Sequence, residues 1–121
     1  MRIHHVALRT KDVERLRAFY EDLLGLRVLR RDEARGSVWL DLDGAVLMIE
    51  RAEADEPPVA VGSMELVAFA VEDKEAWRGR LGGSGRAGGV AIEAETGHTL
   101  YFRDPDGRRV AVSDYPLARS S

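Results

Sequence analysis

The spacing of apolar residues changes within the first third of the chain. Residues 3–10, IHHVALRT, alternate between apolar and polar positions, which predicts a half-buried strand. Residues 11–26 change to helical spacing, with Asp12 placed as an N-cap and Gly25 placed where a left-handed C-terminal cap belongs. A helix is therefore expected here, and its apolar stripe consists of Val13, Leu16, Phe19, Tyr20, Leu23 and Leu24.

The rest of the chain reads as strands joined by turns, followed by the same order again. Strands are expected near 27–32, 37–42 and 45–50, and an acidic, then Pro-rich linker follows over 51–63. The order then restarts, and the predicted elements are a strand in 64–71, a helix in 72–81, a Gly-rich loop over 82–89, and strands near 89–93, 98–103 and 108–114. We expect no regular structure in the tail, 115–121.

Two offsets relate the halves and indicate a duplication. A shift of 61 residues places HHVALRTKDVERLR on ELVAFAVEDKEAWR, and a shift of 63 places Asp43-Gly44 on Asp106-Gly107. The sequence therefore predicts an α+β fold of two tandem β-α-β-β-β modules, residues 1–55 and 64–114, in a single domain over 1–121. Since each module alone would bury too little apolar surface, we expect a curved mixed sheet around a groove.

Composition and charge exclude several classes of function. The formal net charge is −3, which argues against a nucleic-acid partner, because such proteins carry clustered basic surfaces. The chain has no Cys, so it has neither disulfides nor thiolate chemistry. No apolar run approaches the length of a signal peptide or a membrane span, so we expect a cytoplasmic protein with no membrane partner.

Two stretches carry a resemblance to a known family. They are IHHVALRTKDVERLRAFYEDLLGLRV at the start and YFRDPDGRRV near the end, at this separation and on a duplicated pattern. With them the chain resembles the vicinal oxygen chelate superfamily, also called the glyoxalase / bleomycin resistance / dioxygenase family, from Ile3 to about Asp114. The resemblance implies metal ligands on the inner faces of four strands, two per module, and a metal that polarises a substrate with adjacent oxygens.

The four ligand positions that the resemblance implies are occupied here by one donor and three apolar residues. They fall on His5, Met48, Leu66 and Ala111, and the internal repeat supports this because it pairs His5 with Leu66 and Met48 with Ala111. A catalytic divalent ion needs three or more protein ligands, so we expect no metal and no other cofactor. Glu50, on the same strand face as Met48, is the remaining candidate to join His5 and water around an ion.

Alternation also predicts which side chains line the groove and bind a small-molecule ligand. The opposite face of each strand is uniformly apolar and is expected to pack against the helices. The groove is then mostly apolar with a few polar groups, as is usual for small-molecule sites. Its predicted ligand-binding residues are His5, Arg9, Trp39, Met48, Glu50, Leu66, Thr99, Tyr101, Arg109 and Ala111.

Several of these residues have a structural interpretation beside the functional one. Arg9 resembles an Arg that holds a carboxylate of the glutathione moiety in glyoxalase I, but an ion pair with a nearby acid explains it equally well. His5 can be a ligand, or a half-buried His hydrogen-bonded to backbone or water. Trp39 and Tyr101 can stack on a planar ligand or serve core or interface packing. Residues 104–107, DPDG, form a turn to which we assign no chemistry.

These features favour a metal-free protein of the bleomycin-resistance type that sequesters a drug or metabolite, and they leave open whether it also catalyses a reaction. The resemblance implies a homodimer and places antibiotic resistance among the possible roles. The alternative is a metal-dependent enzyme of the same superfamily that uses His5, such as a lyase, isomerase, dioxygenase or thiol transferase. A third hypothesis is a regulatory or accessory subunit whose groove has lost its ligand.

Overall fold

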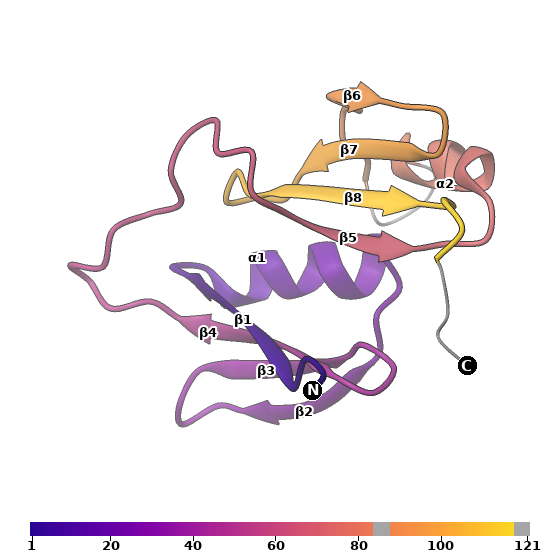
Figure 1. Cartoon of the computed structure of the whole chain (residues 1–121). Coiled ribbons are helices and arrows are strands. Elements are labelled where there is room, and N and C mark those ends of the chain that lie inside the picture. Colours follow the sequence, from indigo (N-terminus) through magenta and orange to yellow (C-terminus); the bar gives the residue numbers. More distant parts are fainter. Residues whose placement is uncertain (84–87, 118–121) are drawn as a thin grey trace. The chain divides into compact units, whose positions relative to one another are not determined.

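The chain folds into two compact units of the same element order (Figure 1). The computed structural model describes residues 1–83 and 88–117. Unit 1 is Met1–Val59 and unit 2 is Ala60–Ser121, so the boundary falls inside the linker expected over 51–63. Each unit consists of one strand, a helical segment and three further strands, which confirms the predicted α+β class and the two tandem β-α-β-β-β modules.

Unit 1 carries a four-stranded mixed sheet and one helical segment. Its elements are β1 (His5–Thr10), α1 (Val13–Ala18), the π-helical segment η1 (Phe19–Leu23), β2 (Val28–Asp32), β3 (Ser37–Asp41) and β4 (Val46–Arg51). The strand order is β1-β4-β3-β2, in which β1 and β4 are parallel and the other pairs antiparallel. These strands match those predicted from the alternation of apolar residues.

Unit 2 repeats this arrangement with the same mixture of parallel and antiparallel pairs. Its elements are β5 (Leu66–Ala70), α2 (Lys74–Leu81), β6 (Ala94–Glu95), β7 (Thr99–Arg103) and β8 (Arg109–Ser113). The strand order is β5-β8-β7-β6, with β5 and β8 parallel. Neither α1 nor α2 is long enough to cross a membrane, and the same holds for every helix in residues 1–83 and 88–117.

Two predicted elements differ from the observed ones. The predicted helix over 11–26 changes to π-helical geometry after Ala18, where the Leu24 N–H donates to the Phe19 carbonyl at 3.1 Å. The wider turn lets adjacent apolar residues face the core together, and both Phe19 and Tyr20 are buried. The strand expected near 89–93 is also wrong, because regular pairing is confined to Ala94–Glu95. Four residues of the predicted Gly-rich loop, 84–87, and residues 118–121 of the predicted tail lie outside the described residues.

The helix starts are built alike in the two units. The Oδ1 of Asp12 accepts a hydrogen bond from the Arg15 N–H at 3.1 Å, and the Oδ1 of Asp73 accepts one from the Glu75 N–H at 2.9 Å. Each carboxylate thereby satisfies one of the backbone donors that a helix leaves free in its first turn. The two N-caps are the pair that the shift of 61 residues aligns.

The turns before the last strand of each unit are also equivalent. The Oδ1 of Asp41 accepts from the Asp43 N–H, and the Oδ1 of Asp104 accepts from the Asp106 N–H, both at 2.9 Å. The following glycine has a positive φ in each turn, 105° at Gly44 and 90° at Gly107. An aspartate that bonds its own backbone two residues on stabilises a tight turn, and glycine accepts the positive φ there at no steric cost, whereas in unit 1 Asp43 also has a positive φ, of 57°. The repeated DLDG and DPDG stretches therefore share this hydrogen bond and this glycine, but differ in backbone conformation at Asp43 and Asp106.

A separate apolar core forms on the helix side of each sheet. In unit 1 α1 packs against β3 and β4, and the fully buried side chains include Leu16, Leu40, Leu47 and Ile49. In unit 2 α2 packs against β7 and β8, over Leu81, Leu100, Phe102, Val110 and Val112. The residues predicted from the sequence to bind a ligand lie on the opposite face of each sheet.

Candidate functional site

Five of the predicted ligand-binding residues share one face of the unit 1 sheet. His5 and Arg9 lie on β1, Trp39 on β3, and Met48 and Glu50 on β4, all on the side opposite the buried core residues. The strand register places Arg9 beside Glu50 and Met48 beside Trp39, whereas His5 lies beside Val46. Partners in register project to the same face of a sheet, so this is one continuous surface.

The other five predicted residues lie in unit 2, on the corresponding face of its sheet. Leu66 is on β5 and is exposed, Thr99 and Tyr101 are on β7, and Arg109 and Ala111 are on β8. The Thr99 hydroxyl donates to the Ser113 hydroxyl at 2.7 Å. Ala111 is fully buried, so its methyl group offers a ligand no accessible surface, and an alanine side chain carries no donor.

The two sheets repeat one row of three side chains across adjacent strands. In unit 1 the row runs from Ala7 through Met48 to Trp39. In unit 2 it runs from Ala68 through Ala111 to an aromatic ring again, Tyr101. The central residue of each row is a position at which the superfamily resemblance implies a metal ligand. Each such position thus has a small residue on one side and an aromatic ring on the other.

A guanidinium group lies over each of these aromatic rings. The Cζ of Arg30 is 5.1 Å from the centroid of the Trp39 ring, and the Cζ of Arg109 is 4.3 Å from the centroid of the Tyr101 ring. Both distances suit cation–π attraction, which is felt within about 6 Å. Arginine side chains of the same sheets therefore hold the two rings in place. The sequence alone did not predict these contacts.

Glu93 holds the guanidinium that covers Tyr101. It accepts from Arg109 Nε at 3.4 Å and, with both oxygens, from Arg103 at 3.0 and 2.9 Å. The Arg103 guanidinium, and more weakly that of Arg109, holds the pKa of the Glu93 carboxyl below its usual range. Sequence reasoning missed Glu93, because its role follows from pairing with β7 and β8 and not from a motif.

Arg9 is paired with a carboxylate that comes from the linker. Its Nε and Nη2 donate to the two oxygens of Glu56, at 2.8 Å for the shortest bond, and Glu50 lies 3.6 Å from Nη1. The hydrogen bonds with Glu56 raise the pKa of Arg9, and the same bonds lower the pKa of Glu56. Of the two interpretations left open by the sequence, the structure shows the ion pair with a nearby acid.

The residues around His5 do not fit a catalytic metal ion. His5 is exposed and not half-buried as its structural interpretation required, and its Nδ1 lies 2.9 Å from Nδ1 of His4. The Glu50 partner on β1 is Arg9, four residues beyond His5, so Glu50 lies about 13 Å further along the strands. Across residues 1–83 and 88–117 no three His, Cys, Asp or Glu side chains gather in a way that could hold an ion.

Another His–carboxylate pair lies at the end of the unit 2 sheet. Nδ1 of His98 is 2.8 Å from Oδ1 of Asp114, and the other oxygen of Asp114 accepts from the Lys74 N–H at 2.9 Å. The backbone N–H of Lys74 and then His98 lower the pKa of Asp114. The pair ties the start of α2 to the end of β8, which is a structural role.

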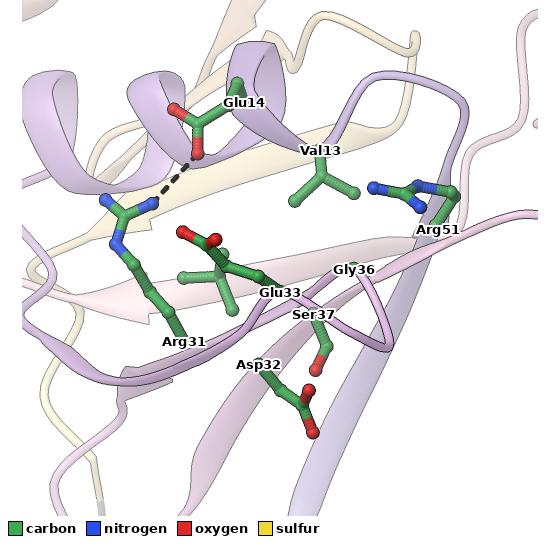
Figure 2. A pocket seen from close by; sticks show the side chains of 9 residues that line it. Val13, Glu14, Arg31, Asp32, Glu33, Gly36, Ser37 and Arg51 are labelled. Atoms are coloured by element: carbon green, nitrogen blue, oxygen red, sulfur yellow. Dashed lines mark hydrogen bonds and ion pairs between the residues drawn. The ribbon is translucent and has the colours of Figure 1, made fainter.

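A pocket of about 320 Å³ lies on the helix side of the unit 1 sheet, away from the predicted ligand face (Figure 2). It is formed by the start of α1, the β2–β3 turn and the end of β4. Its walls combine apolar and charged side chains, among them Val13, Glu14, Arg31, Glu33, Val38 and Arg51. No sequence pattern predicts this pocket, because its residues are far apart along the chain.

Comparison with known proteins agrees with this architecture. A family profile described as "Glyoxalase/Bleomycin resistance protein/Dioxygenase superfamily" matches residues 2–112. No curated protein sequence matches the chain.

Solved structures with the same fold share few identical residues with this chain. A lactoylglutathione lyase from Agrobacterium tumefaciens is 24% identical, with a TM-score of 0.66 over 93% of this chain and 92% of that one. The fosfomycin resistance protein FosX from Mesorhizobium loti is 18% identical, with a TM-score of 0.77 over 95% of this chain and 92% of that one. FosX from Listeria monocytogenes, solved as a mutant with Mn(II) and a dihydroxypropylphosphonic acid, is 17% identical, with a TM-score of 0.71 over 94% and 89%.

Solved structures at this level of identity show the fold alone, and the profile match shows the family. The chain belongs to the Glyoxalase/Bleomycin resistance protein/Dioxygenase superfamily.

Proposed function

We propose that this protein binds a small, planar and partly apolar molecule without a metal ion, and so sequesters a drug or metabolite. The observation that carries the proposal is the identity of the residues at the central positions of the two rows. Met48 and Ala111 lie where the superfamily resemblance implies metal ligands, and neither is a ligand for a hard or borderline divalent ion. The aromatic ring beside each of them offers a flat surface in place of a coordination site.

The surroundings of the two rings support a planar ligand. Trp39 and Tyr101 are only partly buried, so part of each side chain stays accessible. The guanidinium over each ring is itself planar and can stack on an aromatic ligand. Ala7 and Ala68 are small and exposed, and therefore leave room at the other end of each row.

Relatives of the same fold make a small-molecule ligand a reasonable expectation. Their names include lactoylglutathione lyase and fosfomycin resistance protein, which are activities on small molecules. We carry over only the size class of the ligand, since fold alone does not determine function. We further propose that the protein is a cytoplasmic homodimer. Light scattering on the purified chain measures its oligomeric state.

A thermal-shift screen tests the proposal directly. The full chain is heated with planar aromatic compounds, glycopeptides and small carboxylates, because a ligand of the folded state raises Tm by mass action. We expect planar compounds to raise Tm, and we expect Trp39→Leu and Tyr101→Leu to reduce that rise. Trp77→Leu is the matched control, since Trp77 also lies under a guanidinium, that of Arg80 at 4.8 Å, but belongs to α2.

The screen separates binding from the other two hypotheses. If no compound raises Tm, the binding function is contradicted and an accessory subunit is favoured. If compounds raise Tm only when a divalent ion is added, the metal-free part of the proposal is wrong. Equal loss of the Tm rise in the Trp77→Leu control would show that the sheet rings are not the binding surface.

A further inference from the structure

The pocket in Figure 2 is physically separate from the face that carries the proposed function. Val38 lines the pocket and belongs to the buried side of β3, whereas Trp39, the next residue, belongs to the opposite face. Successive side chains of a strand point to opposite faces, so the pocket and the row at Trp39 lie on different sides of one sheet. A ligand in this pocket would therefore be additional to the ligand proposed above.

Arg51 is held at one side of the pocket by a glycine. A Cβ placed on Gly36 would come within 2.7 to 2.9 Å of three atoms of the Arg51 guanidinium, so this group lies directly against the glycine backbone. The Arg51 N–H also donates to the Gly36 carbonyl at 3.2 Å, which fixes the end of β4 beside the start of β3. Gly36 has a φ of 64°, a conformation that favours glycine independently of this contact.

The Arg51 guanidinium has no charged partner within the part of the chain that the structure describes. In Figure 2 it extends toward Val13 and no dashed line reaches it, whereas Arg31, at the opposite side of the pocket, is joined to Glu14. The Arg31–Glu14 pair, at 2.9 Å, neutralises two of the charges that line the pocket. Arg51 thus brings an uncompensated positive charge to one side.

Glu33 contributes a negative charge to the pocket, opposite in sign to that of Arg51. Its carboxylate forms no hydrogen bond or ion pair with any residue in 1–83 or 88–117, and its backbone carbonyl accepts from the Gly36 N–H at 3.2 Å in the β2–β3 turn. The side chain lies on the Arg31 side of the pocket, whereas Arg51 enters from the other (Figure 2). Val13 and Val38 supply the apolar part of the pocket wall.

We propose that this pocket binds a small zwitterion with an aliphatic side chain, such as a free amino acid. The carboxylate of the ligand would pair with Arg51, whose guanidinium can donate two parallel hydrogen bonds. The ammonium group would pair with Glu33, and the aliphatic side chain would cover Val13 and Val38. A volume of about 320 Å³ is near the lower end of the range for small-molecule sites, which excludes a large ligand.

Titration calorimetry with L-valine and the full chain tests this proposal. We expect saturable binding of one L-valine per chain, and we expect Arg51→Gln and Glu33→Gln each to weaken it by about tenfold or more, because each removes a charged hydrogen bond. Arg35→Gln is the matched control, since Arg35 is in the same turn and does not line the pocket. Circular dichroism confirms that each variant is folded.

Two analogues of L-valine test the zwitterion itself. 3-Methylbutanoate lacks the ammonium group and isobutylamine lacks the carboxylate, so both should bind at least about tenfold more weakly than L-valine. The proposal is overturned if L-valine does not bind, if Arg51→Gln and Glu33→Gln bind it as the wild type does, or if either analogue binds equally well. None of these outcomes bears on Trp39 or Tyr101, so the proposal can fail while the proposed function stands.

Discussion

Arg9 on β1 and Glu56 from the linker form a bidentate ion pair with hydrogen bonds of 2.8 to 3.2 Å. Glu56 also accepts from the backbone N–H of Glu53 at 3.2 Å, so the carboxylate fastens its own loop to the exposed face of the sheet. A ligand carboxylate that approached Arg9 would first have to displace Glu56. The guanidinium of Arg9 is therefore already occupied by an internal partner.

This ion pair predicts a pH-dependent contribution to stability. The pKa of Glu56 lies below its ordinary value of 4.5 in the folded chain, so its stabilising effect is present above pH 4.5 and is lost as the pH falls through the lowered value. Glu56→Gln should flatten this part of the profile of unfolding free energy against pH, measured by urea denaturation. The effect should be small, because the pair is solvent-exposed. An unchanged profile in Glu56→Gln, or the same change in Glu53→Gln, would argue against it.

The N-caps predict equal effects in the two units. Asp12→Ala and Asp73→Ala each remove a hydrogen bond to the first turn of a helix, and each should lower the unfolding free energy by about 1 kcal/mol. Asn keeps an oxygen acceptor, so Asp12→Asn and Asp73→Asn should retain most of the stability. Thermal denaturation of the four variants measures this. Asn variants as unstable as the Ala variants would show that charge, and not the cap, is responsible.

The two equivalent turns should differ in their sensitivity to substitution. Asp104 is 4% exposed and accepts from the backbone N–H groups of Asp106 and Arg108, whereas Asp41 is half-buried and accepts from one. Asp104→Ala leaves two backbone N–H groups without this acceptor. It should lower the unfolding free energy by about 1–3 kcal/mol, which is more than the loss expected for Asp41→Ala. Urea denaturation compares the two variants. A larger loss for Asp41→Ala would contradict this ranking.

The core of unit 1 predicts a larger loss. Leu16 on α1 is fully buried, so Leu16→Ala should lower the unfolding free energy by about 2–5 kcal/mol through lost burial and the cavity left behind. Leu29→Ala is the control, because Leu29 is 45% exposed on β2 and its truncation should have little effect. Comparable losses in the two variants would mean that α1 does not pack as described.

The strands and the duplication were predictable because they depend on local patterns. Alternation along β1 and β4 identified both faces of the sheet, and Asp12 and Gly25 marked the ends of the first helical segment. The π-helical turn at Phe19–Leu23 was not predictable, since the same apolar stripe fits an ordinary helix. The two-residue strand β6 was missed because so short a pairing leaves no alternation to detect.

For the candidate site, the alternation along each strand predicted which face the side chains occupy, but not which residues they contact. Parity placed His5, Arg9 and Trp39 on one face, which the register confirms. The partners of these residues come from other segments: Glu56 reaches Arg9 from the linker, and Arg30 reaches Trp39 from β2. Such pairs depend on tertiary folding, and neither spacing nor composition reports them. The same reason explains why the pocket beside Arg51 had no sequence signal.

We propose that the sheet positions occupied by His5, Met48, Leu66 and Ala111 hold no metal ion. The most direct measurement is elemental analysis of the purified full chain after incubation with nickel, zinc, iron or manganese and gel filtration, in parallel with His5→Ala. We expect far less than one ion per chain in the wild type and the same amount in His5→Ala. Close to one ion per wild-type chain, lost in His5→Ala, would contradict it.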